Sequence, residues 1–245
     1  MSGHSKWATI KHKKAATDAK RGNLFTKLIK EISVAARGGG NPDTNPRLRV
    51  AIERAKESSM PSDNIDRAIK KGTGQLEGVT YEDITLKGYG PGGVAIYVEG
   101  VSDNKNRTTA EVRTIFTKRG GNMAGAGSVA WMFEKKGYIV VSKKSAEEDK
   151  LMGVALDAGA EDMIVEDENY AIKTSPQDFF KVKKATDDAG IKTEDAQISL
   201  LPKNTVKVEG PDAKKILELV DAIEEHEDVQ HVYANFDIPD ELIKE

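Results

Sequence analysis

Apolar residues recur at two different spacings along the chain, and the change divides it into a helical front part and a mixed remainder. As far as Gly72 they recur at three- and four-residue steps, which is the spacing of one face of an α-helix. Asn23 and Asn45 are the expected caps of the first two helices, and glycines follow the first and the third. The pattern predicts three helices that form a small bundle, over residues 24–37, from 46 onward, and over 62–71.

The spacing changes to two from Thr80, which indicates β-strands. Two strands, 81–87 and 94–101, are joined by the Gly- and Pro-rich segment 88–93. This segment has the spacing of a dinucleotide-binding fingerprint, but Pro91 and a further strand follow its first glycines where such a site requires a helix. We therefore interpret the segment as a hairpin turn.

A helix follows this hairpin, and Thr108 with Glu111 forms a capping box that predicts its start. A strand is expected over 128–133. The elements after residue 138 come in the order strand, helix, strand, strand, helix, strand, which is the order of a ferredoxin-like module. Their expected ranges are 138–142, 146–158, 162–166, 170–174, 176–189 and 196–201.

The last elements could complete the sheet that begins at Tyr81. They are a strand at 206–208, a helix at 212–225 and a strand at 229–236. The expected fold class is therefore α+β multidomain, with a basic three-helix N-terminal domain and two α/β domains, one ferredoxin-like and inserted in the other. The expected domains are 1–78 for the basic arm and helices, 79–134 with 205–245 for the discontinuous α/β domain, and 135–204 for the ferredoxin-like domain.

Composition argues against several classes of protein. No apolar run approaches the ~18 residues of a membrane span, so no membrane is implied. The chain contains no cysteine, which excludes disulfides and thiol nucleophiles and is typical of a reducing cytosol. The N-terminus lacks the apolar stretch of a signal peptide, and we expect a bacterial cytoplasmic protein.

No group of residues predicts catalysis or a cofactor. The four histidines include no pair with the i, i+4 spacing of a zinc-binding helix, so no metal site is expected. Acidic pairs such as Glu147-Glu148 are adjacent in the sequence and typical of solvated surface. Since no nucleophile, base and orienting group assemble, we expect neither an enzyme nor a small-molecule substrate.

Charge is distributed unevenly. The first 72 residues hold 16 Lys and Arg against seven Asp and Glu, a net charge of +9, whereas the remaining 173 residues carry −12. Such a front part favours a polyanion as partner, and a phosphate backbone is the obvious candidate. Residues 2–21 could be a nucleic-acid-binding arm or a frayed, solubilising tail. The candidate contact residues there are Lys6, Trp7, Lys11, His12, Lys13, Lys14, Lys20 and Arg21.

The predicted helices present further cations. If the first helix extends back to Lys20, that residue shares with Lys27, Lys30 and Arg37 a face opposite the apolar residues. A solvated lysine face is the common alternative, although only Glu31 offsets this stripe. The candidate contact residues of the helices are Lys27, Lys30, Arg37, Arg47, Arg49, Arg54, Arg67, Lys70 and Lys71.

The loop 102–107 is a possible anion-binding site. Arg107 stands beside the positive end of the next helix, where electrostatics disfavour a cation, and Asn104 and Asn106 are neighbouring donors. Alternatively, the two Asn residues supply turn conformations and Arg107 pairs with a nearby acid. The sequence leaves both interpretations open.

Several segments together resemble the YebC/PmpR family. They are GHSKWATIKHKK (3–14), DAKRGNLFTKLIKEI (18–32), AARGGGNPDTNPRLR (35–49), MPSDNIDRAIKKGTG (60–74), GYGPGGVA (88–95), DNKNRT (103–108) and GSVAWMF (127–133). The resemblance covers essentially the whole chain and implies a basic helical N-terminal part and two α/β domains, one inserted in the other. Family members are described as probable DNA-binding transcriptional regulators, and relatives include a mitochondrial translational activator of cytochrome oxidase.

Two functions follow from this resemblance. In the first, the front end binds duplex DNA near promoters and the acidic domains contact a protein partner; in the second, it binds structured ribosomal RNA and assists elongation. Neither a base-reading helix-turn-helix nor an RNA-module signature is present, which indicates recognition of backbone or shape. The resemblance places the DNA-binding transcriptional regulator first, with the ribosome-associated translation factor as the alternative. A protein-interaction scaffold is a third class.

Overall fold

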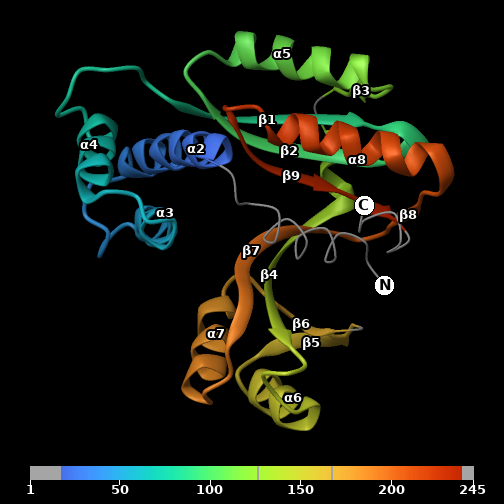
Figure 1. Ribbon diagram of the computed structural model, residues 1–245. Coiled ribbons are helices and arrows are strands. Elements are labelled where there is room, and N and C mark those ends of the chain that lie inside the picture. Colours follow the sequence, from blue (N-terminus) through green and yellow to red (C-terminus); the bar gives the residue numbers. More distant parts are fainter. Residues whose placement is uncertain (1–17, 126, 167, 239–245) are drawn as a thin grey trace.

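The structure, a computed structural model of the 245-residue chain, describes residues 18–125, 127–166 and 168–238 (Figure 1). The first part is a helical unit. Its helices are α2 (Asp18–Ala36), α3 (Pro46–Glu57) and α4 (Ser62–Gly72). The Asn45 side chain caps α3 by accepting a hydrogen bond from the backbone N–H of Leu48, as the sequence predicts. Buried aliphatic residues from all three helices form its core, among them Leu28, Ile32, Leu48, Ala51, Ile65 and Ala68.

Helices α2 and α4 cross closely at Gly72. A Cβ atom at this position would lie 2.2 Å from the Ser33 carbonyl oxygen and 2.7 Å from the Ala36 Cβ atom. The Ser33 hydroxyl also donates to the carbonyl of Ala68, which ties the two helices together. Only glycine permits this approach of the two backbones.

The middle of the molecule is an antiparallel four-stranded sheet in the order β3-β1-β2-β9 (Figure 1). Its strands are β1 (Glu82–Tyr89), β2 (Ala95–Ser102), β3 (Asn122–Met123) and β9 (Val229–Ala234). Helices α5 (Lys105–Lys118) and α8 (Gly210–Glu224) bury Phe116 and Ile216 in the same core against one face of this sheet. A short parallel pair, β8 (Val206–Lys207) with β10 (Phe236–Asp237), lies near the chain's end.

The segment 88–93 is the hairpin turn that the sequence predicts. Tyr89 pairs with Ala95, and the Gly90 N–H donates to the Val94 carbonyl at 2.8 Å. Gly92 has a φ of 73°, a backbone conformation that favours glycine. Because the chain continues as strand β2, no helix N-terminus is available there to hold a pyrophosphate.

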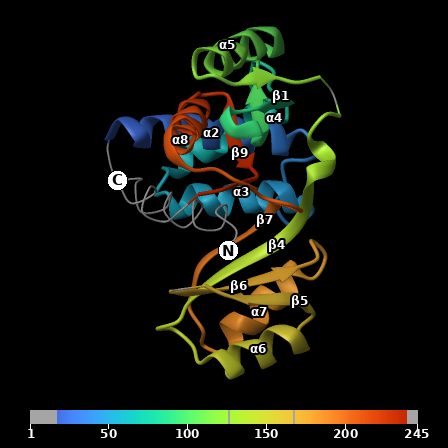
Figure 2. The same ribbon diagram turned by 90° about the vertical axis from the view of Figure 1, so that its right-hand side faces the viewer.

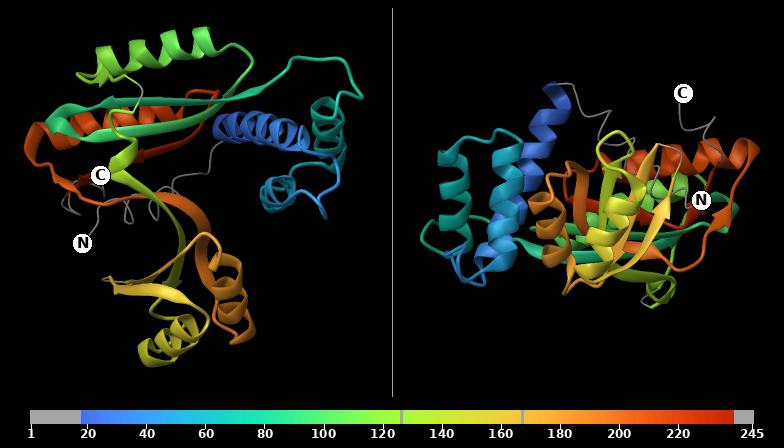
Figure 3. Two further views of the ribbon diagram at one scale, coloured as in Figure 1. Left: turned by 180° about the vertical axis from the view of Figure 1, so that it is seen from behind. Right: turned by 90° about the horizontal axis from the view of Figure 1, so that it is seen from below.

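A second antiparallel sheet has the order β5-β6-β4-β7, and α6 and α7 lie on one side of it (Figures 2 and 3). Its elements are β4 (Phe133–Ser142), α6 (Glu148–Asp157), β5 (Ala160–Val165), β6 (Asn169–Thr174), α7 (Phe179–Asp188) and β7 (Thr193–Pro202). This is the ferredoxin-like topology. Since β9, from the end of the chain, joins the first sheet beside β2, the module is inserted in the α/β domain, and the predicted fold class is confirmed.

Several expected element boundaries are wrong, and three of the differences have a reason that is visible in the structure. Helix α5 begins at Lys105 instead of Thr108, because the Asn104 side chain accepts from the Arg107 N–H and caps it earlier. Residues 130–132 form a 3-10 turn in place of the expected strand, and β4 then runs unbroken from Phe133. Helix α2 begins at Asp18, so Asn23 is not its cap and instead donates to the Glu225 carbonyl at 2.8 Å.

Candidate nucleic-acid interface

Four of the predicted contact residues are exposed and have no partner among the described side chains. Arg49 on α3 and Arg67, Lys70 and Lys71 on α4 are exposed. None of the four forms an ion pair or side-chain hydrogen bond within the described part of the chain. Their charges are therefore available to a ligand, although Lys70 and Lys71 also stabilise the negative end of the α4 dipole.

Three other predicted arginines are partly matched by internal acceptors. Exposed Arg47 forms two hydrogen bonds with the Asp83 carboxylate, at 2.7 and 3.0 Å. Arg54 pairs with Glu31 on α2 at 3.1 Å. Arg37, just after α2, donates one bond to the Tyr81 carbonyl at 3.0 Å and is otherwise exposed. These three side chains are weaker candidates for binding a phosphate than the four cations described above, because an anion must compete with a neighbouring acceptor.

An open hollow of about 580 Å³ lies between the end of α2, the end of α4 and the glycine-containing segment 73–81. It brings together Arg37 and Lys71, which are far apart in the sequence and are both predicted to contact nucleic acid. Glu77 also lines it. Two cations against one carboxylate give the hollow a net positive charge, which suits a phosphate group.

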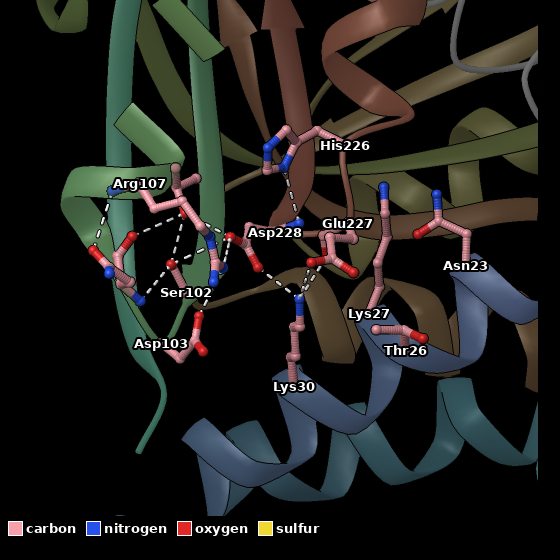
Figure 4. A network of polar contacts seen from close by, with 12 residues as sticks. Asn23, Thr26, Lys27, Lys30, Ser102, Asp103, Arg107, His226, Glu227 and Asp228 are labelled. Carbon is pink, nitrogen blue, oxygen red and sulfur yellow. Dashed lines mark hydrogen bonds and ion pairs between the residues drawn. The ribbon is translucent and has the colours of Figure 1, made fainter. Parts of the chain in front are cut away.

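Lys27 and Lys30 do not form the solvent-facing stripe that the sequence predicts. The Lys27 ammonium donates to the Glu224 carbonyl at 2.5 Å. The Lys30 side chain is only 7% exposed, and its ammonium lies 2.6 Å from the Asp228 carboxylate (Figure 4). This face of α2 packs against the end of α8 and the turn that follows it, because partly buried carbonyl oxygens and the buried Asp228 carboxylate there bind its lysines. Lys30 is thus a structural residue.

Asp228 is the centre of this polar network (Figure 4). Its fully buried carboxylate also accepts from Thr108 at 2.5 Å and from Arg107 at 2.9 Å. Burial raises the pKa of Asp228, but hydrogen bonds from Lys30, Thr108 and Arg107 outweigh it and lower the pKa to about 2. The carboxylate therefore stays charged and joins the helical unit to the α/β domain.

The loop 102–107 belongs to the same network. Arg107 binds Asp103 at 2.7 Å in addition to Asp228, and hydrogen bonds to these two acids raise its pKa. Asn104 caps α5, and Asn106 is exposed. The guanidinium is thus paired with internal acids, as in the second interpretation of this loop, and the loop has a structural role.

Reasoning from the sequence missed Asp228 and His226 as structural residues. The Asp228 N–H donates to His226 Nδ1 at 3.1 Å, and His226 Nε2 lies 2.9 Å from the Glu111 carboxylate. Both residues occur in a run of acids that looks like ordinary surface. An isolated Lys on a helix and a distant Asp carry no local signal of their pairing.

The predicted contacts of the arm, Lys6, Trp7, Lys11, His12, Lys13 and Lys14, lie outside the described residues, as do the side chains of Lys20 and Arg21. No helix within the described ranges is long and apolar enough to cross a membrane. The same ranges hold no cluster of three or more His, Asp or Glu side chains arranged for a metal ion.

Comparisons with known proteins agree with this architecture. The TACO1/YebC protein N-terminal domain matches residues 5–75, and the TACO1/YebC second and third domain matches 81–236. A probable transcriptional regulatory protein of Dictyoglomus turgidum is 58% identical over 246 residues, covering 100% of this chain and 99% of the relative. One of the same name from Desulfatibacillum aliphaticivorans is 57% identical and covers 100% of both chains. The crystal structure of a conserved hypothetical protein from Aquifex aeolicus, 50% identical, matches with a TM-score of 0.82 over 93% of this chain and 94% of that one.

Proposed function

The chain belongs to the TACO1/YebC family, as its motifs predicted, and on this premise we propose that it is a non-enzymatic, cytoplasmic regulator of gene expression that binds nucleic acid. Duplex DNA is the target we place first, because the relatives are named probable transcriptional regulatory proteins. The observation that carries the proposal is a set of four exposed cations on α3 and α4 that form no ion pair with any described residue, namely Arg49, Arg67, Lys70 and Lys71. The basic arm, residues 2–21, adds five lysines and Arg21 in front of them.

These residues suit contacts with the phosphate backbone. Arg and Lys that neutralise phosphates fix a protein on a duplex without reading its sequence. Helix α4 carries Asp63 in its first turn and exposed Asp66 in its second, so its N-terminal end repels phosphate and does not suit entry into a groove. The proposed mode is therefore binding by backbone and shape, with a protein partner on the acidic α/β domains.

Charge reversal of Lys11, Lys13 and Lys14 to Glu tests the arm in the full-length chain. We expect the slope of log affinity against log salt concentration to become shallower by roughly 2 to 3, because about three fewer phosphates are neutralised. The matched control reverses Lys181, Lys184 and Lys192, which are exposed on the ferredoxin-like module. Equal slopes for the wild type and the arm variant would refute the arm's role.

The identity of the nucleic acid needs a separate experiment. Crosslinking in cells, followed by parallel sequencing of bound DNA and RNA, separates the two targets. Recovery of promoter fragments supports the transcriptional regulator, and recovery of ribosomal RNA supports the translation factor. Absence of both, together with no binding in vitro at low ionic strength, would leave a protein-interaction scaffold.

A further inference from the structure

Two aromatic rings are exposed where the first sheet connects to the ferredoxin-like module. Trp131, in the 3-10 turn η2 (Ala130–Met132), is 64% exposed, and Tyr89, at the end of β1, is 36% exposed. The Trp131 indole N–H donates to the Ser128 carbonyl at 3.0 Å. The Tyr89 hydroxyl donates to the same carbonyl oxygen at 3.2 Å. Two rings that are far apart in the sequence are thus fixed to one backbone atom.

This arrangement leaves the apolar faces of both rings in water. Their polar atoms already have a partner, so the N–H and O–H groups do not explain the exposure. Trp131 has the largest exposed fraction of any large hydrophobic side chain in the described ranges. Since both rings are exposed, a flat ligand can reach them, and anchoring reduces the conformational entropy lost when it binds.

Two lysines give this surface a positive charge. Lys87 precedes Tyr89 by two residues on β1, so both side chains lie on the same face of the sheet. Exposed Lys203 has its backbone N–H bonded to the Met132 carbonyl, next to Trp131. Within the described residues neither ammonium forms an ion pair with an acid, and the Lys87 ammonium lies 5.4 Å from the centre of the Tyr97 ring. Aromatic faces beside lysines that no acid neutralises match the bases and phosphates of a nucleic-acid strand.

We propose that Trp131 and Tyr89 form a stacking site for an unpaired nucleobase, with Lys87 and Lys203 binding the adjoining phosphates. The proposal rests on the proposed nucleic-acid-binding function and extends the contact surface from the helical unit to the junction of the α/β domains. A base inside a duplex is stacked on its neighbours and cannot use this site. The site therefore selects a single strand, a loop or a bulge.

The test exploits the fact that the chain has two tryptophans, Trp7 and Trp131. In a Trp7→Phe background the indole fluorescence reports on Trp131 alone. This protein is titrated with single-stranded DNA, single-stranded RNA and duplex DNA, all at low ionic strength. We expect saturable quenching by the single strands, and the stronger of the DNA and RNA responses identifies the source of the base.

Affinity is measured in the same background from the anisotropy of labelled oligonucleotides. Trp131→Ala should weaken single-strand binding by about tenfold or more, because one stacked base is lost, and Trp131→Phe should retain most of the affinity. The control is Phe180→Ala, which removes an aromatic ring that is 51% exposed on α7 and should leave the affinity unchanged. Thermal melting of each variant monitors folding.

The outcomes separate this inference from the proposed function. Single strands that bind without quenching Trp131, and with equal affinity for Trp131→Ala, would overturn the stacking site and leave the proposed function intact. Binding of duplex alone would do the same. Absence of binding to all three nucleic acids would contradict both the stacking site and the proposed nucleic-acid-binding function.

Discussion

The Lys30 ammonium and the Asp228 carboxylate are separated by 198 residues in the sequence and lie 2.6 Å apart, almost completely shielded from solvent. This pair fixes α2 against the turn between α8 and β9. Arg107 and Thr108 of α5 bind the same carboxylate, so one buried acid connects α2 of the helical unit with α5 of the α/β domain. The orientation of α3 and α4, with their exposed cations, relative to the sheets therefore depends on this network as well as on the connecting segment 73–81.

Removing Lys30 should strongly destabilise the folded chain. Lys30→Ala leaves a buried carboxylate without its closest charged partner, and we expect a loss of about 3 to 5 kcal/mol in the free energy of unfolding. Urea denaturation measures it. The control is Arg47→Ala, which breaks an exposed ion pair with Asp83 and should cost less than about 1 kcal/mol. Similar losses for the two variants would show that the buried pair contributes no more to the free energy of unfolding than the exposed pair does.

Acid should weaken the same network. The pKa of Asp228 is about 2 in the folded state against an ordinary value of 3.8. A lowered pKa contributes stability above the ordinary value that is lost as pH falls towards the folded value, and here it amounts to about 2 kcal/mol. We expect the stability difference between the wild type and Asp228→Asn to shrink as the pH falls from about 5 to about 3. A difference independent of pH would contradict the assignment.

The exposed cations of α4 should contribute to nucleic-acid affinity and contribute little to the stability of the fold. Replacing Arg67, Lys70 and Lys71 together by Ala should make the salt dependence of nucleic-acid affinity shallower by roughly 2 to 3. The expected loss of stability is at most about 2 kcal/mol, from the weaker interaction with the helix dipole. Filter binding over a range of salt concentrations measures the first effect and thermal melting the second. Retained affinity and slope would place the contact elsewhere.

The crossing of α2 and α4 should depend on Gly72. Gly72→Ala forces its methyl group against the Ser33 carbonyl, and overpacking of this kind should destabilise the chain by about 1 to 3 kcal/mol. Gly153→Ala is the matched control on α6. No atom lies within 4 Å of a Cβ there, and removing a helical glycine should stabilise by about 0.5 to 1 kcal/mol. Equal effects on the melting temperature would refute the close crossing.

Much of the fold could be predicted because its signals are local. Asn45 and Pro46 mark the start of α3, and Gly90 and Gly92 mark the hairpin. The start of α5 was misplaced because two capping signals, Asn104 and Thr108, lie four residues apart. Asn104 caps, while the Thr108 hydroxyl binds Asp228, and no local rule distinguishes those roles.

By itself, the sequence determined the elements, the ferredoxin-like order and the concentration of positive charge in the front third, because spacing, turn residues and charge are properties of neighbouring positions. The tertiary structure alone decided which cations are available. Lys30 and Lys70 look equivalent in the sequence, yet one is buried against a carboxylate and the other is exposed. The difference arises because electrostatic partners are chosen by distance in space, and the acid that binds Lys30 comes from the far end of the chain.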